Sequence, residues 1–180
     1  MSRLIRFSVA MSIDGFIATL DGGYDWIPMD DGIDFAAYLA KIDTLLMGRG
    51  TFETANATEE GRAIFDGMAV YVVSTTLDPA AHPGVTIIGG PGREDVVTAV
   101  ADLKASPGKD IWLFGGSVLF RSLLEAGLVD RVEVAVVPRL LGTGIPLVRG
   151  LESIEALALH SSEAFDSGIV LLKYDVAGDG

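Results

Sequence analysis

The sequence predicts an α/β domain in which helices cover both faces of a mostly parallel sheet and an antiparallel hairpin forms one edge. Through the first 127 residues, short apolar runs alternate with segments of helical periodicity, which is typical of parallel strand-helix-strand units. The later residues contain strand-like runs separated by turn residues, which favours an antiparallel edge. Because no linker or long repeat divides the chain, we expect one domain over residues 1–176 and a short tail over 177–180.

The first quarter of the chain predicts two strands with a loop and a helix between them. The apolar run 4–11 reads as a strand that ends in turn residues, and a loop rich in Gly and Asp follows over 18–32. Asp34 is the predicted N-cap of a helix over 35–42, in which apolar residues share one face. A buried strand is expected over 43–48.

The middle of the chain repeats this pattern of strands and helices. Runs rich in β-branched residues predict strands over 68–74 and 84–90. Helical spacing of valines and leucines predicts a helix over 94–105, which the sequence SPGKD ends. A strand over 111–116 then leads into a helix over 117–127.

The end of the chain predicts strands that pair with one another. Before these strands, we expect Ser117 to cap the helix over 117–127 and Gly127 to end it. An alternating strand over 130–138 precedes a turn-rich connection, and the runs 157–165 and 169–176 predict a β-hairpin.

Composition and charge limit the classes of function. The formal net charge of −12 disfavours nucleic acid and anionic membranes as partners and leaves a small-molecule ligand as the expected one. The chain has no cysteine, and its histidines His82 and His160 are expected at the surface, so no metal site is predicted. The pairs Asp30–Asp31 and Glu59–Glu60 are interpreted as solvated loop charges. Because the first residues form no signal peptide and no run could span a bilayer, we expect a cytoplasmic location.

Residues suited to binding a phosphorylated ligand follow three of the predicted strands. Gly48 and Gly50 free the backbone around Arg49, which can bind a phosphate, and Thr51 can cap the next helix while its N–H meets a phosphate oxygen. The alternative interpretation is a capped turn with a solvated arginine. This alternative stays open.

The second and third strand ends carry weaker signals. Ser74 and Thr75 offer hydroxyl groups, although such residues often merely turn a chain. Gly115 and Gly116 precede a helix start and would let a ligand approach the backbone. The pattern is neither the dinucleotide motif GxGxxG nor a phosphate-binding P-loop, which disfavours an ordinary Rossmann enzyme.

Together, four segments resemble the dihydrofolate reductase-like superfamily, in particular the branch typified by the C-terminal reductase domain of the riboflavin biosynthesis protein RibD. The segments, which run in this order along nearly the whole chain, are SVAMSIDGFIA, DTLLMGRGTFE, YVVSTTL and IWLFGGSVLFRSLLEAGLVDRVEVAVVPRLLGTGIPLV. The resemblance implies a three-layer fold that binds NADPH across the strand ends and transfers a hydride to a small heterocyclic or carbonyl substrate.

The resemblance also implies which residues contact the cofactor. Residues 48–51 are the implied contacts of the pyrophosphate and the 2′-phosphate, with Arg49 favouring NADPH over NADH. Residues 115–119 would hold the pyrophosphate, and Ser74 and Thr75 would contact the adenosine. The full implied set is Ala10, Ile17, Gly48, Arg49, Gly50, Thr51, Ser74, Thr75, Phe114, Gly115, Gly116, Ser117, Val118 and Leu119. Ala10 and Ile17 of this set would lie near the nicotinamide.

Two residues are candidates for a role in catalysis, either as the proton donor or as a side chain that lines the substrate pocket. Asp14 is either a substrate contact or an Asx-type turn before Gly15, and Trp26 is either a pocket residue or a core aromatic. A water molecule is the alternative proton donor.

The sequence departs from the patterns of both branches, which leaves the substrate open. Dihydrofolate reductases carry a pterin-binding carboxylate on the first helix. Asp34 lies near that position, but its spacing to Gly48 does not match the family pattern. Arg62 is the only candidate in residues 56–67 for an anchor of the folate tail. For riboflavin synthesis, no deaminase domain precedes the chain, and Leu140 and Leu141 make the substrate end apolar. We expect an NADPH-dependent reductase that forms a homodimer; the alternatives are a non-catalytic nucleotide-binding module of the same fold and a dihydrofolate reductase.

Overall fold

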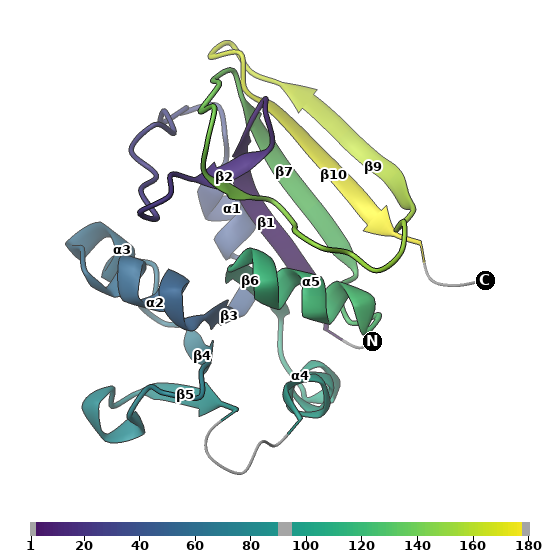
Figure 1. The fold of residues 1–180 in the computed structure, drawn as a ribbon. Helices are drawn as coiled ribbons and strands as arrows, with labels where there is room; N and C mark the ends of the chain where they lie inside the picture. The colour runs from purple at the N-terminus through teal and green to yellow at the C-terminus, as the bar shows by residue number, and fades with distance from the viewer. Residues whose placement is uncertain (1–2, 90–94, 178–180) are drawn as a thin grey trace.

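A computed structural model describes residues 3–89 and 95–177 of the chain (Figure 1). Its strands are β1 (Ile5–Ser12), β2 (Phe16–Ala18), β3 (Ile42–Gly48), β4 (Ala69–Val73), β5 (Val85–Ile88), β6 (Asp110–Gly115), β7 (Arg131–Val137), β8 (Ile145–Pro146), β9 (Leu157–Ala164) and β10 (Val170–Val176). Its helices are α1 (Phe35–Leu39), α2 (Arg49–Asn56), α3 (Glu59–Ala63), α4 (Val96–Ala105), α5 (Ser117–Glu125) and the 3-10 turn η1 (Pro79–Ala81). Predictions that concern Gly90, Glu94 and residues 178–180 lie outside the described residues.

The main sheet has eight strands in the order β5-β4-β3-β6-β1-β7-β10-β9. The strands from β5 to β7 are parallel, whereas β10 runs antiparallel to β7 and β9 antiparallel to β10. This arrangement confirms the predicted parallel sheet and its antiparallel hairpin edge. A separate antiparallel pair of β2 and β8 joins Phe16 to Pro146, and the sequence did not predict it because each strand has at most three residues.

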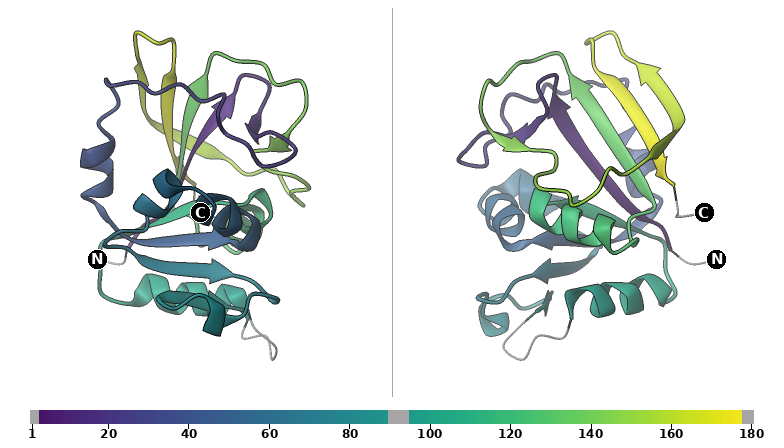
Figure 2. Two further views of the ribbon diagram at one scale, coloured as in Figure 1. Left: turned by 90° about the vertical axis from the view of Figure 1, so that its left-hand side faces the viewer. Right: turned by 45° about the vertical axis from the view of Figure 1, so that its right-hand side comes forward.

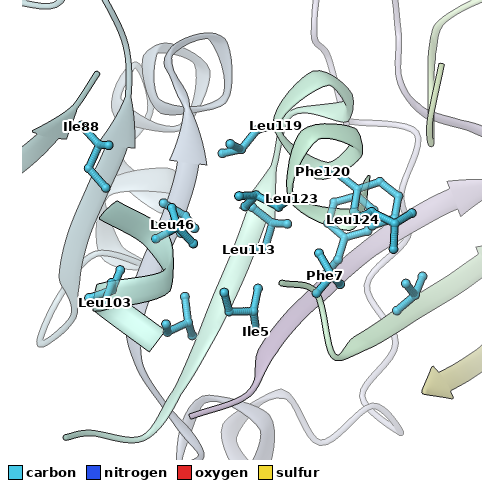
Figure 3. Packing of buried hydrophobic residues seen from close by; sticks show 14 of the residues in the cluster. Ile5, Phe7, Leu46, Ile88, Leu103, Leu113, Leu119, Phe120, Leu123 and Leu124 are labelled. Atoms are coloured by element: carbon cyan, nitrogen blue, oxygen red, sulfur yellow. The ribbon is translucent and has the colours of Figure 1, made fainter. Parts of the chain in front are cut away.

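The core lies in two layers, one on each face of the sheet, as the alternation of side chains along the strands requires. Leu46 of β3 and Leu113 of β6 point to the first layer, which Leu103 of α4 and Leu123 of α5 complete (Figure 3). Met47 and Trp112, one residue along each strand from these, point to the opposite layer, which α1 and α2 cover. The helices therefore lie on both sides of the sheet (Figure 2), and the predicted three-layer fold is confirmed.

The first predicted helix is shorter than expected. Asp34 caps α1 as predicted, because its carboxylate accepts a hydrogen bond from the N–H of Ala37 at 2.8 Å. The helix ends at Leu39 rather than at Ile42. Ile42 instead opens β3, where it is buried and pairs with Asp110, so tertiary pairing of a β-branched residue prevails over the helical spacing.

Several predicted caps and loops are also wrong in detail. Glu59 and Glu60 lie in the first turn of α3, where carboxylates are stabilised by the helix dipole, and not in a loop. Thr51 and Ser117 both lie inside their helices, whose N-caps are glycines. Gly127 follows α5 with a φ of +66°, which confirms it as the helix stop.

The longest helix in the described part of the chain, α4, has ten residues, about half the length that a membrane-spanning helix needs.

Candidate functional site

The three strand ends that the sequence marked lie side by side at one edge of the sheet. β3 lies between β4 and β6 and is parallel to both, so the carboxyl ends of these three strands meet at the same edge. Ser74 follows β4, Gly48 ends β3, and Gly115 ends β6. In parallel α/β sheets this edge is where ligands bind.

Two helices begin next to each other at this edge, and both begin at glycine. The N-caps of α2 and α5 are Gly48 and Gly116, and neither helix has a side-chain capping bond. By contrast, the N-caps of α1, α3 and α4 are aspartate or threonine residues that accept a backbone hydrogen bond. The first N–H groups of α2 and α5 are therefore left without a side-chain partner, which is the arrangement that an anionic ligand satisfies.

Close packing brings these two helix starts together. A Cβ atom added to Gly116 would lie 3.8 Å from the Cα of Gly48, and one added to Gly115 would lie 3.1 Å from Cγ2 of Thr51. Gly116 also has a φ of +98°, which a side chain would strain. Glycine at these positions thus lets the two helix starts lie close together, and we call the N–H groups at these starts the cradle. Adjacent N–H groups of this kind fit the pyrophosphate of a dinucleotide.

A cleft of about 590 Å³ adjoins this cradle on the side of β4 and α4. Its lining includes Arg49, Ser74 and Thr75, so the structure brings these three predicted residues together. The guanidinium of Arg49 donates a hydrogen bond from Nη1 to Oγ1 of Thr76 at 3.2 Å and is half exposed. Its position suits a phosphate group held at the mouth of the cleft.

Ser74 also stabilises a turn, which was the alternative interpretation of this residue. Its hydroxyl oxygen is buried and accepts hydrogen bonds from the N–H groups of Thr76 at 3.2 Å and Leu77 at 3.0 Å. The hydroxyl hydrogen is free to point elsewhere. Sequence reasoning missed two residues that line the cleft, Thr76 and Asp95. The available signals were a threonine just after a strand for Thr76 and an aspartate before a helical pattern for Asp95, which caps α4.

Asp14 ties two loops together at the carboxyl ends of β1 and β7. Its carboxylate accepts hydrogen bonds from the hydroxyl of Ser12 at 2.6 Å and from the N–H groups of Leu141 at 3.1 Å and Gly142 at 2.7 Å. These bonds, the one from Ser12 foremost, lower the pKa of Asp14 below its ordinary value. An ionised carboxylate is a poor proton donor. The N–H of Phe16 donates to the hydroxyl of Ser12 at 3.0 Å and not to Asp14, so the carboxylate joins two loops rather than forming an Asx-type turn. The catalytic role stays a prediction.

Three further predicted residues do not line the cleft. Ala10 lies in β1 and pairs with Ala135, and Ile17 lies half-buried in β2. Trp26 lies in the loop before α1, and its buried indole N–H has no hydrogen-bond partner among the described residues. An unpaired buried donor is costly, which fits a group that meets a ligand.

The start of α5 contributes its backbone more than its side chains. Leu119 is buried in the first core layer, so only its N–H can face the cradle, whereas Val118 is 75% exposed. Phe114 packs edge-on against Trp112, with ring centroids 4.7 Å apart, on the α1 side of the sheet.

Arg62 and the histidines lie away from this site. Arg62 lines a different cleft, at the amino ends of β4 and β5. His82 packs against the ring of Phe52, and His160 bonds to Asp175. Within residues 3–89 and 95–177, no three His, Asp or Glu residues are grouped as a metal ion requires.

Curated relatives match nearly the whole chain or one domain of a longer protein. The uncharacterized protein YyaP of Bacillus subtilis is 31% identical over 96% of this chain and 94% of its own length. The riboflavin biosynthesis protein RibD of Corynebacterium ammoniagenes is 28% identical over 85% of this chain. The match spans 50% of that RibD, so the chain corresponds to about half of it.

Solved structures show the same fold. A putative riboflavin biosynthesis protein from Shewanella has a TM-score of 0.78 and 27% identity, over 99% of this chain and 100% of that one. Dihydrofolate reductase from Enterococcus faecalis, in a complex with NADP(H), has a TM-score of 0.67 and 17% identity over 97% of each chain. The fold is therefore the dihydrofolate reductase-like one.

The family model described as the RibD C-terminal domain matches residues 3–171, which include every strand end described above. The chain belongs to the RibD C-terminal domain family.

Proposed function

We propose that this protein is an NADPH-dependent reductase that transfers a hydride to a small heterocyclic or carbonyl substrate. The observation that carries the proposal is the pair of adjacent, glycine-capped starts of α2 and α5, with the guanidinium of Arg49 at the mouth of the neighbouring cleft. Membership of a family that contains RibD reductase domains supports the same reaction class.

Each part of the cofactor has a chemical counterpart in this site. The N–H groups at the starts of α2 and α5 would hold the pyrophosphate, and Arg49 with Thr76 would bind the 2′-phosphate. The hydroxyls of Ser74 and Thr75 suit the adenosine half. Asp95, which also lines the cleft, can accept a hydrogen bond from a hydroxyl or amino group and repels a phosphate, which favours a sugar or base beside it.

When bound, NADPH supplies the hydride; the chain orients both reactants and excludes water from the reacting carbon. Ala10 of β1 and Ile17 of β2 present small or apolar surface where the nicotinamide would lie. The lowered pKa of Asp14 keeps that carboxylate ionised, so we propose that a water molecule delivers the proton.

The test is NADPH consumption measured beside NADPH binding. The substrates are dihydrofolate, the ribosylamino-pyrimidine that RibD reductases act on, and simple carbonyl compounds. Turnover of the pyrimidine or a carbonyl compound is expected. Binding without turnover on any substrate would instead assign a non-catalytic nucleotide-binding module, and turnover of dihydrofolate alone would assign a dihydrofolate reductase.

We also propose that the protein is a homodimer formed through its hairpin edge. All eight residues of β9 are exposed, and Leu157 and Leu159 are 41% and 60% exposed on an edge strand. Apolar side chains on an unpaired edge favour association with a second copy.

A further inference from the structure

A second cleft, of about 380 Å³, opens between α2, α3 and the segment that leads into β5. Figure 1 shows these elements beside β4 and β5, at the lower left. The cleft is lined by Val70 and Val85, which pair at the amino ends of β4 and β5. The cofactor cleft instead reaches Val73 and Ser74, at the carboxyl end of β4. The two clefts therefore do not share a ligand.

Aromatic rings form one side of this second cleft. Phe52 of α2 and Phe65 lie nearly parallel, with ring centroids 6.0 Å apart and 14° between their planes. The imidazole of His82 stands at 89° to Phe52, with its centroid 5.1 Å away. Phe52 is buried behind the other two rings, whereas Phe65 and His82 are half-buried, so the cleft meets an apolar ring beside an imidazole.

The charge of the lining is opposite to that of the chain. The chain has a formal net charge of −12, yet among the described residues that line this cleft Arg62 is the only one with a formal charge. Its Nη1 donates to the backbone oxygen of Asn56 at 2.7 Å, which holds the guanidinium at the cleft and leaves its other N–H groups free. The neighbouring carboxylates Glu59, Glu60 and Asp66 do not belong to the lining.

We propose that this cleft binds a small aromatic or heteroaromatic carboxylate. The ring would lie against Phe65 and Met68, and the carboxylate would accept hydrogen bonds from the guanidinium of Arg62 and the side-chain amide of Asn56. This site goes beyond the proposed reductase function, because it uses none of the residues assigned to NADPH.

The test uses benzoate as the probe and follows amide resonances of the ¹⁵N-labelled full chain by NMR. We expect benzoate to bind in the millimolar range and to shift the amide resonances of Asn56, Ala81, His82, Gly84 and Val85. Benzamide has the same ring without the charge, and we expect it to bind about tenfold more weakly, because hydrogen bonds between charged groups are roughly twice as strong as neutral ones.

Arg62→Gln keeps an amide that can bond to the oxygen of Asn56 and removes the charge, so it should weaken benzoate binding about tenfold. Arg149→Gln, an exposed arginine outside the cleft, is the matched control and should leave binding unchanged. Shifts confined to the Arg49 cleft, equal binding of benzamide, or unchanged binding in Arg62→Gln would overturn the proposal. None of these results depends on whether NADPH binds.

Discussion

Among single residues, two polar side chains of the candidate site hold its backbone in place. Ser74 accepts two N–H groups of its own turn, and Asp14 joins the end of β1 to the loop at Leu141 and Gly142. Residue type alone could not separate these roles, because a carboxylate or hydroxyl accepts a backbone N–H as readily as a ligand N–H.

The role of Asp14 predicts a difference between two substitutions. Asp14→Asn keeps an oxygen acceptor for the N–H of Gly142 and should leave kcat within about tenfold of the wild type, whereas a lost proton donor lowers rates at least about a hundredfold. Asp14→Ala frees the loop and should raise KM. Steady-state kinetics on the substrate identified by the panel of compounds measures kcat and KM of both variants. A hundredfold loss of kcat in Asp14→Asn would show that the Asp14 carboxyl group is the proton donor.

The lowered pKa of Asp14 also fixes the direction of a pH effect. Because the folded-state pKa lies below the unfolded value, the bonds of the carboxylate contribute stability above pH about 4 and lose it as the pH falls through the lowered pKa. The loop at Leu141 should therefore loosen only in acid. Protection factors of the Leu141 and Gly142 amides correct for the intrinsic pH dependence of amide exchange. Protection factors that do not fall as the pH is lowered from 6 through the acid unfolding range would contradict this.

The ion pair between Arg6 and Glu133 predicts a large effect of one neutral substitution. Both residues are buried, and Nε of Arg6 donates to Oε1 of Glu133 at 3.1 Å, which links β1 to β7. Glu133→Gln would leave the buried guanidinium with Asp110, 3.3 Å from Nη1, as its remaining carboxylate partner, and should lower the free energy of unfolding by about 2 kcal/mol. Denaturant unfolding measures this, with the exposed Glu163→Gln on β9 as the control that should change little.

At the scale of elements, the sequence predicts the long strands and helices and misses the short ones. β3 and α5 lie within one or two residues of their predicted ranges, because four buried apolar side chains on each set the pattern. The pairing of β2 with β8 depends on two short segments far apart in the sequence. The sequence predicts threonine and serine caps for α2 and α5, whereas both N-caps are glycines, which depart from ordinary capping preferences.

The start of α5 predicts a coupled loss of stability and cofactor binding. Gly116→Ala would force a side chain to a φ of +98° and should cost about 1–3 kcal/mol of unfolding free energy. It should also weaken NADPH binding, because it shifts the first N–H groups of the helix. Gly127→Ala, at a φ of +66° after the same helix, should destabilise the fold without changing NADPH binding. Equal effects of both on the dissociation constant would place NADPH elsewhere.

At the scale of the whole molecule, an acidic protein is proposed to bind an anionic cofactor. The formal net charge is −12, which repels an anionic ligand. At the candidate site, backbone N–H groups and the charge of Arg49 offset this repulsion, and no basic surface is needed. The same local reasoning was available from the sequence for residues 48–51, whereas the position of Arg62 at a separate cleft required the three-dimensional arrangement of α3 and β5.

The exposed hairpin edge predicts a homodimer that one charge disrupts. Leu159→Glu places a carboxylate on the exposed face of β9 and should convert a dimer to a monomer in size-exclusion chromatography with light scattering. Ala105→Glu, at the exposed end of α4, should leave the dimer intact. A wild-type protein that is monomeric at micromolar concentration would remove the proposal.

Titration of the wild type and Arg49→Ala with NADPH and NADH tests the central proposal most directly. The two cofactors differ only in the 2′-phosphate, so NADH serves as the internal control. We expect Arg49→Ala to weaken NADPH about tenfold to a hundredfold and NADH by no more than about twofold, because a charge-assisted contact to the phosphate is lost. Equal weakening of both cofactors, or no binding of either by the wild type, would contradict the assignment of this cleft to NADPH.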